Sequence, residues 1–252
     1  MDIQYRKEGR VGIVALAPLF ASGASLARGA AELERLRQEI AWDREVRSIV
    51  VRGAGVFAPQ DGAEASYVEL LQSGLAEPPT PAAVLARFAV PTIAAIEADA
   101  RGPGLELALG CDLRVCSETS RFAMDHLTRG ELPMDGGIQR LARLVGRGTA
   151  LSLILVPEAL DADAARGIGL VHRIARGENP LQVAMALASA IGDLAPVAVR
   201  YTKEALLKGM DMSLEQGLRL EADLYFLLHG TSDRSHGITA FREKKPPEYE
   251  GR

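Results

Sequence analysis

The stretch that decides the fold is residues 87–118, RFAVPTIAAIEADARGPGLELALGCDLRVCSE. Residues 92–96 are a short apolar run behind a proline, which is typical of a buried strand. Residues 98–104 are small and rich in Gly and Pro, so the backbone turns tightly there and a ligand can approach it closely. Residues 105–109 predict a helix, and residues 112–116 predict a second strand. A glycine-rich loop that opens a helix directs free N–H groups at an anion or a polarised carbonyl; a purely structural loop is the equal alternative.

This stretch resembles the crotonase (enoyl-CoA hydratase/isomerase) superfamily. In that family a strand ends in Val-Asn-Gly, and a small loop, three glycines, any residue, Glu and Leu, and then a Cys-Asp strand follow. The corresponding positions here are Ile96-Glu97-Ala98, Gly102-Pro103-Gly104, Leu105-Glu106-Leu107 and Cys111-Asp112. Further matches extend over nearly the whole chain. The resemblance implies the α/β crotonase fold, with a ββα spiral core over residues 1–195 and a helical C-terminal oligomerisation region over residues 196–252.

Composition and charge are those of an ordinary globular chain of 252 residues with a net charge of -4. Lys and Arg are scattered, so no basic stripe indicates a nucleic acid or an anionic membrane. No apolar run reaches the roughly 20 residues of a membrane span, and the N-terminus does not read as a signal peptide. The four histidines show no metal-ligand spacing. Cys111 and Cys116 are expected to be buried free thiols, which predicts a reducing cytoplasm.

The other segments support an alternation of strands and helices. Residues 3–5, 11–16 and 48–52 predict strands, and residues 26–41 carry apolar residues at helical spacing. This order implies right-handed crossovers and therefore an α/β core. Trp42, at the end of that helix, is expected to be a packing residue. Towards the C-terminus we expect a strand at 170–174 and helices at 180–192, 197–209 and 214–228.

One half of an oxyanion hole is expected after the strand at 48–52. There the family has a Phe-Ser-Ala-Gly-Ala-Asp-Leu-like segment, whose second Ala, four residues after the Phe, donates an N–H to the substrate. The resemblance assigns this position to Asp61, with Gln60 in place of the Gly, and it places Phe57 and Gln60 at the substrate. A carboxylate beside a developing oxyanion is repulsive unless it turns away or is protonated.

The other half of the hole departs further from the family. Its second donor is the N–H of the middle glycine, and that position here is Pro103, which has no N–H. Removing one such donor typically costs about 10²–10³ in rate. Either Gly104 supplies the donor after a small backbone shift, or the chemistry does not need two donors.

Three side chains are catalytic candidates. Glu106 matches the first catalytic glutamate of the hydratases and suits a general base; the alternative is a charge that stabilises a helix N-terminus. His126 stands where the hydratases have their second glutamate. It lies nine residues before Asp135, as do the His and Asp of the family's β-diketone hydrolase branch. In such a dyad the Asp fixes the imidazole tautomer and the His activates water. The alternatives are a partly exposed histidine and a helix N-cap.

The C-terminal segment at 232–247 follows the family ending closely. The resemblance implies that Phe241 and Lys244 help to hold the adenine and phosphates of CoA, often those of a neighbouring subunit, because an ammonium attracts phosphate. It also implies a homotrimer or a dimer of trimers. The alternative is a C-terminal helix with a charged face.

Three functions follow from these observations. The first is an enzyme acting on an acyl-CoA or carrier-bound acyl thioester through an enolate, in hydration, dehydration, isomerisation or C–C cleavage, with no cofactor besides the CoA of the substrate. The second is a retro-Claisen hydrolase of a cyclic β-diketone with a His126–Asp135 dyad. The third is a non-catalytic acyl-CoA-binding homologue. The CoA-type ending favours the first.

Overall fold

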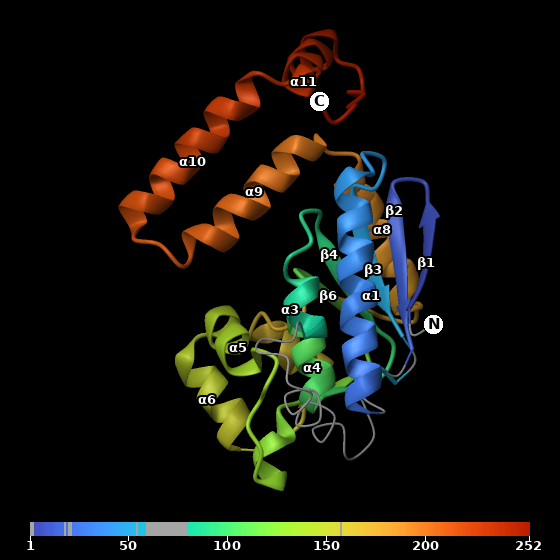
Figure 1. The fold of residues 1–252 in the computed structure, drawn as a ribbon, viewed down its shortest axis with the longest axis vertical. Helices are drawn as coiled ribbons and strands as arrows, with labels where there is room; N and C mark the ends of the chain where they lie inside the picture. Colours follow the sequence, from blue (N-terminus) through green and yellow to red (C-terminus); the bar gives the residue numbers. More distant parts are fainter. Residues whose placement is uncertain (1–2, 18, 20–21, 54, 59–79, 157) are drawn as a thin grey trace.

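A six-stranded sheet runs through the centre of the computed structural model, which describes residues 3–17, 19, 22–53, 55–58, 80–156 and 158–252 (Figure 1). The strand order is β1-β2-β3-β4-β6-β9. Only β1 and β2 pair in antiparallel fashion, and every other neighbouring pair is parallel. The strands are β1 (Ile3–Glu8), β2 (Val11–Leu16), β3 (Ser48–Arg52), β4 (Thr92–Ile96), β6 (Leu113–Ser117) and β9 (Arg173–Ala175).

Helices cover both faces of this sheet, as its apolar strands require. Val51 of β3 lies in the same buried cluster as Leu26 and Leu33 of α1 (Gly23–Trp42). Val50, on the opposite face of β3, packs with Ala184 of α8 (Pro180–Gly192). The predicted α/β class is therefore confirmed as three layers, helix on sheet on helix.

The second part of the core is built from shorter elements. A three-stranded sheet has the order β5-β7-β8, from β5 (Ala100–Arg101), β7 (Arg121–Ala123) and β8 (Leu160–Asp161). The helices that belong with it are α3 (Pro81–Leu85), α4 (Gly102–Leu109), the 3₁₀ helix η2 (Asp125–Arg129), α5 (Gly137–Val145), α6 (Arg147–Leu155) and α7 (Ala162–Gly167).

Several predicted boundaries shift for local reasons. The helix expected at 26–41 begins at Gly23, because the Ser22 side chain accepts a hydrogen bond from the Ser25 N–H and caps it. The strand expected at 170–174 was placed too early: β9 begins at Arg173. Leu170 and Val171 are buried in the core outside any strand. Trp42 was wrongly expected to pack, since its side chain is 88% exposed.

The C-terminal helices form a separate group beside the core. They are α9 (Pro196–Gly209), α10 (Leu214–His229) and α11 (Ser232–Glu243), which Figure 1 shows at the end of the molecule away from α4. Among the described residues no single helix is long and apolar enough to cross a membrane; α8 and α9 meet that test only as a pair bent by 106°. The division at residue 196 and its role in oligomerisation stay predictions.

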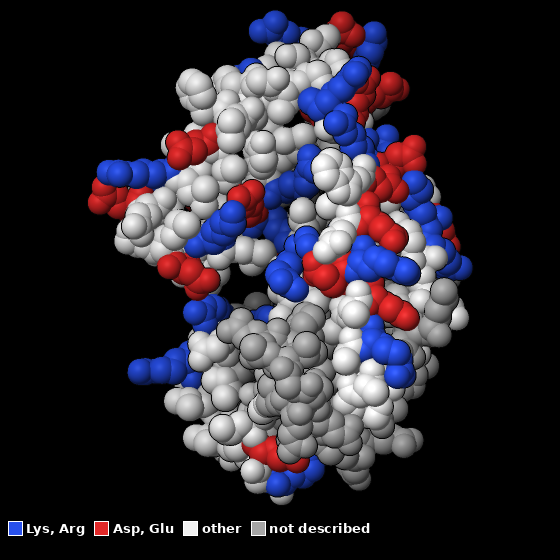
Figure 2. Space-filling model, in the orientation of Figure 1, with Lys and Arg blue, Asp and Glu red and all other residues white. Residues whose placement is uncertain are grey.

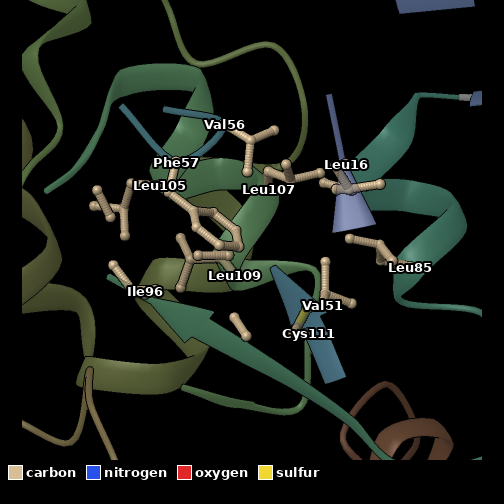
Figure 3. Close-up of a cluster of buried hydrophobic side chains, with 14 of the residues drawn as sticks. Leu16, Val51, Val56, Phe57, Leu85, Ile96, Leu105, Leu107, Leu109 and Cys111 are labelled. Atoms are coloured by element: carbon tan, nitrogen blue, oxygen red, sulfur yellow. The ribbon is translucent and has the colours of Figure 1, made fainter. Parts of the chain in front are cut away.

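The glycine-rich loop is held against the chain that follows β3. The Arg101 N–H donates to the Phe57 carbonyl oxygen at 2.8 Å. A Cβ at Gly104 would lie 2.0 Å from that same oxygen, so only glycine permits this approach. The Phe57 side chain is buried among Leu105, Leu109 and Ile96 (Figure 3). Backbone contact and apolar packing together fix the start of α4.

We predict that Gly104→Ala is strongly destabilising. The added methyl group collides with backbone atoms, which cannot move aside as a side chain can, and overpacking of this kind costs about 3 kcal/mol or more. Urea unfolding measures the loss. Gly148→Ala is the matched control, because Gly148 lies in the first turn of α6 and a Cβ there meets nothing within 4 Å. Equal stability of the two variants would contradict the close approach.

Candidate active site

Glu106 is the centre of the site. It lies on α4 with a residue exposure of 1%. Three backbone N–H groups converge on its carboxylate: Met134 donates to Oε1 at 3.1 Å, and Asp135 and Gly137 donate to Oε2 at 2.5 and 3.4 Å. A buried carboxylate needs such donors. The structure therefore places Glu106 in a fixed, fully enclosed orientation rather than at the surface.

The turn that supplies these donors fits closely around Glu106. Gly136 has φ of +81°, a conformation that glycine adopts readily. A Cβ at Gly137 would lie 2.8 Å from Cγ of Glu106 and 2.7 Å from Cε of Met124. The sequence Pro-Met-Asp-Gly-Gly at 133–137 is the local signal for this turn, but it does not reveal that the turn's amides bind Glu106.

His126 faces Glu106. The ring lies on η2 with an exposure of 1%, and Nε2 is 3.1 Å from Oε1 of Glu106. The two atoms are within ion-pair distance. Among the described residues neither ring nitrogen has a hydrogen-bond partner. The alternative of a partly exposed histidine is therefore wrong, because the ring is enclosed and lies against the Glu106 carboxylate.

Asp135 is buried next to this pair, but its side chain points elsewhere. Its Oδ1 accepts a hydrogen bond from the Thr80 hydroxyl and its Oδ2 accepts one from the Ala82 N–H at 3.0 Å. These contacts place the carboxylate at the N-terminus of α3, whereas Gly136 occupies the N-cap of α5. Hydrogen bonds thus join Asp135 to α3 through its side chain and to Glu106 through its backbone; the His126–Asp135 dyad stays a prediction.

Burial raises the pKa of Asp135 to about 6. The nearby Glu106 carboxylate acts in the same direction, while the bonds from Thr80 and Ala82 and the charge of Arg140 oppose it. Arg140 also donates from Nη1 to the Asp135 carbonyl oxygen. Thr80 and Arg140 were not predicted from the sequence, since neither lies in a motif.

The start of α4 carries the second half of the predicted oxyanion hole. N–H groups in the first turn of a helix have no acceptor within the helix. The first turn of α4 holds Gly102, Pro103 and Gly104, and Pro103 has no N–H. Gly104 as the donor in place of the family's middle glycine stays a prediction. Asp61 and Gln60, predicted for the other half of the hole, lie outside the described residues.

The structure separates Phe57 from the predicted CoA contacts Phe241 and Lys244. The Phe57 ring is part of the core, and its carbonyl oxygen accepts a hydrogen bond from the glycine-rich loop; a contact of Phe57 with the substrate stays a prediction. Phe241 is 85% exposed on α11, and Lys244 ends that helix in a left-handed conformation with φ of 55°. Both lie at the opposite end of the molecule from α4 (Figure 1).

Comparison with known proteins agrees with this geometry. Residues 27–252 match the enoyl-CoA hydratase/isomerase family. The chain belongs to this family. It is 33% identical over 249 residues to the short-chain-enoyl-CoA hydratase of Clostridium acetobutylicum, covering 97% of this chain and 95% of the relative. It is 37% identical over 236 residues to the enoyl-CoA hydratase domain-containing protein 2 of Mus musculus, covering 87% and 77%.

Solved structures of the family share the fold. The enoyl-CoA hydratase from Bacillus anthracis superposes over the whole of both chains with a TM-score of 0.85 and 28% identity. The crotonase fold with C-terminal helices is thus confirmed for this enoyl-CoA hydratase/isomerase family member. Among the residues that the structure describes, no group of three or more His, Cys, Asp or Glu side chains is placed to hold a metal ion.

The raised pKa of Asp135 predicts a pH-dependent stability. The folded protein keeps this proton up to about pH 6, whereas the unfolded chain loses it near pH 3.8. The group therefore contributes stability that is present at low pH and lost as the pH rises through 6. Relative to Asp135→Asn, the wild-type protein should lose up to about 3 kcal/mol between about pH 4 and pH 7, since one pKa unit corresponds to about 1.4 kcal/mol.

Chemical unfolding of both proteins across this range measures the difference. Thr80→Val is the matched control, because it removes a hydrogen bond that lowers the Asp135 pKa. In this variant the loss of stability should extend to higher pH than in the wild-type protein. A difference between wild type and Asp135→Asn that stays constant with pH would show that Asp135 is ionised throughout.

Proposed function

We propose that this enoyl-CoA hydratase/isomerase family member moves protons at an acyl-CoA thioester through an enolate, with Glu106 as the general base and His126 as its partner. The observation that carries the proposal is the pair itself: two buried titratable side chains, 3.1 Å apart, with the carboxylate fixed by three amides. One named relative is a short-chain-enoyl-CoA hydratase and the other is named for an enoyl-CoA hydratase domain, which supports a lyase reaction for this chain.

The start of α4 supports the substrate side of the reaction. A thioester carbonyl that accepts from the Gly104 N–H acquires negative charge in the transition state, and the N-terminus of a helix favours that charge. Glu106 lies two residues further along the same helix. The loss of the donor at Pro103 lowers the stabilisation of the oxyanion, so this half of the hole depends on Gly104.

His126 gives the pair a different chemistry from two carboxylates. A neutral imidazole takes up a proton at its acceptor nitrogen at one stage, and the imidazolium formed gives a proton back at a later stage. Glu106 and His126 can thus share one proton without placing two negative charges 3 Å apart. This arrangement suits protonation of an enolate after addition, isomerisation or C–C cleavage.

The hydrolase alternative has less support. In a His–Asp dyad the carboxylate orients the imidazole, but the Asp135 oxygens accept bonds from Thr80 and Ala82. The alternative of a binding protein without activity is decided by experiment.

Deuterium exchange at the α-carbon of acyl-CoA thioesters, followed by NMR, tests the proposal whatever the later steps are. We expect the wild-type protein to catalyse exchange and Glu106→Gln to slow it by about 10²–10⁴, because the variant has no base. Glu39→Gln is the control, since Glu39 is an exposed residue of α1. Acyl-CoA binding without exchange in the wild type would identify a non-catalytic protein, and normal exchange in Glu106→Gln would exclude Glu106 as the base.

We also propose that the protein is a homo-oligomer assembled through its C-terminal helices. Leu214, Leu218 and Tyr225 follow one face of α10 and are exposed, with Leu214 at 80%. An apolar stripe of this kind on a helix is typical of a protein interface. Within one chain, Phe241 and Lys244 lie far from the candidate active site. A neighbouring copy of the chain could supply both residues to that site.

Light scattering after size-exclusion chromatography measures the assembly. Leu214→Gln with Leu218→Gln should reduce a trimer or hexamer to monomers, because two polar amides then lie in the interface. Trp42→Gln is the control, since Trp42 is an equally exposed apolar residue on α1. An unchanged mass for the double variant would place the interface elsewhere.

A further inference from the structure

A small cavity lies where the end of α1, the segment before β4 and the start of α9 meet. Its volume is about 50 Å³, which is room for a few water molecules or one small oxyanion. Half of its wall is apolar, from residues that include Val46, Val90 and Pro196. No step of the proposed reaction uses this cavity.

The cavity lies at the amino ends of the parallel strands, whereas Glu106 lies beyond their carboxyl ends. Val46 and Val90 lie just before β3 and β4, at the amino ends of these parallel strands. The glycine loop and α4 follow the carboxyl end of β4. The length of the strands therefore separates the cavity from the candidate active site.

Three of the arginines that line the cavity have no ion pair among the described residues. Arg44, Arg47 and Arg200 line it, and among the described residues none of them has a carboxylate within ion-pair distance. The other two charged lining residues already have partners: Asp43 binds Lys7 at 3.1 Å, and Arg37 binds Glu34. Figure 2 shows Lys and Arg side chains, with Asp and Glu side chains among them, where the C-terminal helices meet the rest of the molecule.

Arg47 is the most unusual of the three. It is buried, and its Nη1 and Nη2 donate to the carbonyl oxygens of Gly192 at 3.0 Å and Tyr249 at 2.5 Å. Its Nε has no hydrogen-bond partner among the described residues. Burial and the nearby charge of Arg10 lower its pKa, and the charges of Asp233 and Asp193 oppose that shift only in part. A buried cation with no carboxylate within ion-pair distance is costly, and an anion in the cavity would relieve that cost.

We propose that this cavity binds a small oxyanion of the phosphate type, held by Arg44 and Arg200 and by the charge of Arg47. The partly apolar wall lowers the local dielectric constant and strengthens these attractions. Guanidinium groups match tetrahedral and planar oxyanions with paired N–H donors. Because the lining residues come from α1, from the segment before β4 and from α9, the bound anion would tie the C-terminal helices to the core.

Thermal unfolding in low-millimolar potassium phosphate, compared with potassium chloride at equal ionic strength, tests the site, and calorimetry with inorganic phosphate gives the affinity. A ligand of the folded state raises the melting temperature in a saturable way. We expect saturable stabilisation of the wild type and, for Arg44→Gln with Arg200→Gln, a loss of affinity of at least about tenfold, since a hydrogen bond to a charged group is worth that much or more. Arg47 is left intact because it holds two backbone carbonyls.

Two controls decide between sources of the effect. Arg35→Gln, an exposed arginine on α1 outside the cavity, should bind phosphate as the wild type does. Lys244→Ala removes the predicted CoA-phosphate contact and should also leave the effect unchanged. Stabilisation that is lost in Lys244→Ala, or that rises without saturation and equally in all variants, would overturn the proposal, as would the absence of any difference between phosphate and chloride.

Discussion

The site depends on keeping one carboxylate buried. Glu106 is enclosed on α4, and a buried carboxylate without donors would cost several kcal/mol. Three amides of the turn at 134–137 meet that requirement, and His126 closes the remaining side. The turn, the glycine at 137 and the position of η2 are all set by this requirement. The same contacts stabilise the buried Glu106 carboxylate and fix its orientation. A fixed orientation is what the proposed role of general base requires.

Much of the fold was predictable because it follows from local patterns. The strand at 48–52 and the helix at 180–192 coincide with β3 and α8, since apolar spacing and proline or β-branched residues define them. The bounds predicted for the strand at 170–174 were wrong because buried apolar residues also occur in loops between helices and strands. The prediction for Trp42 was wrong because an aromatic side chain at the end of a helix can also lie in solvent. Resemblance to the family supplied what periodicity cannot: the crotonase fold with its spiral core.

The candidate residues could be named from the sequence, but their contacts could not. Glu106 and His126 are candidates because each stands at a family position, and the structure brings them together. Asp135 is a third candidate, yet its side chain binds the start of α3 and its backbone binds Glu106. No sequence pattern distinguishes these two uses of one residue, because they depend on a partner 53 residues away. Phe57 also has two uses that the sequence does not distinguish. Its ring packs in the core, and its carbonyl oxygen accepts a hydrogen bond from the glycine-rich loop.

In the proposed reaction, the departures from the family at Pro103 and His126 act on different halves of the chemistry. Pro103 would remove a donor from the place where negative charge develops, so the transition state would lose stabilisation there. His126 would change the place where protons are exchanged, because imidazole both donates and accepts. A reaction with less charge on the carbonyl oxygen tolerates the first change, and a reaction that must return a proton to carbon benefits from the second. The two substitutions are therefore consistent with one another: they favour steps limited by proton delivery over steps limited by oxyanion stabilisation.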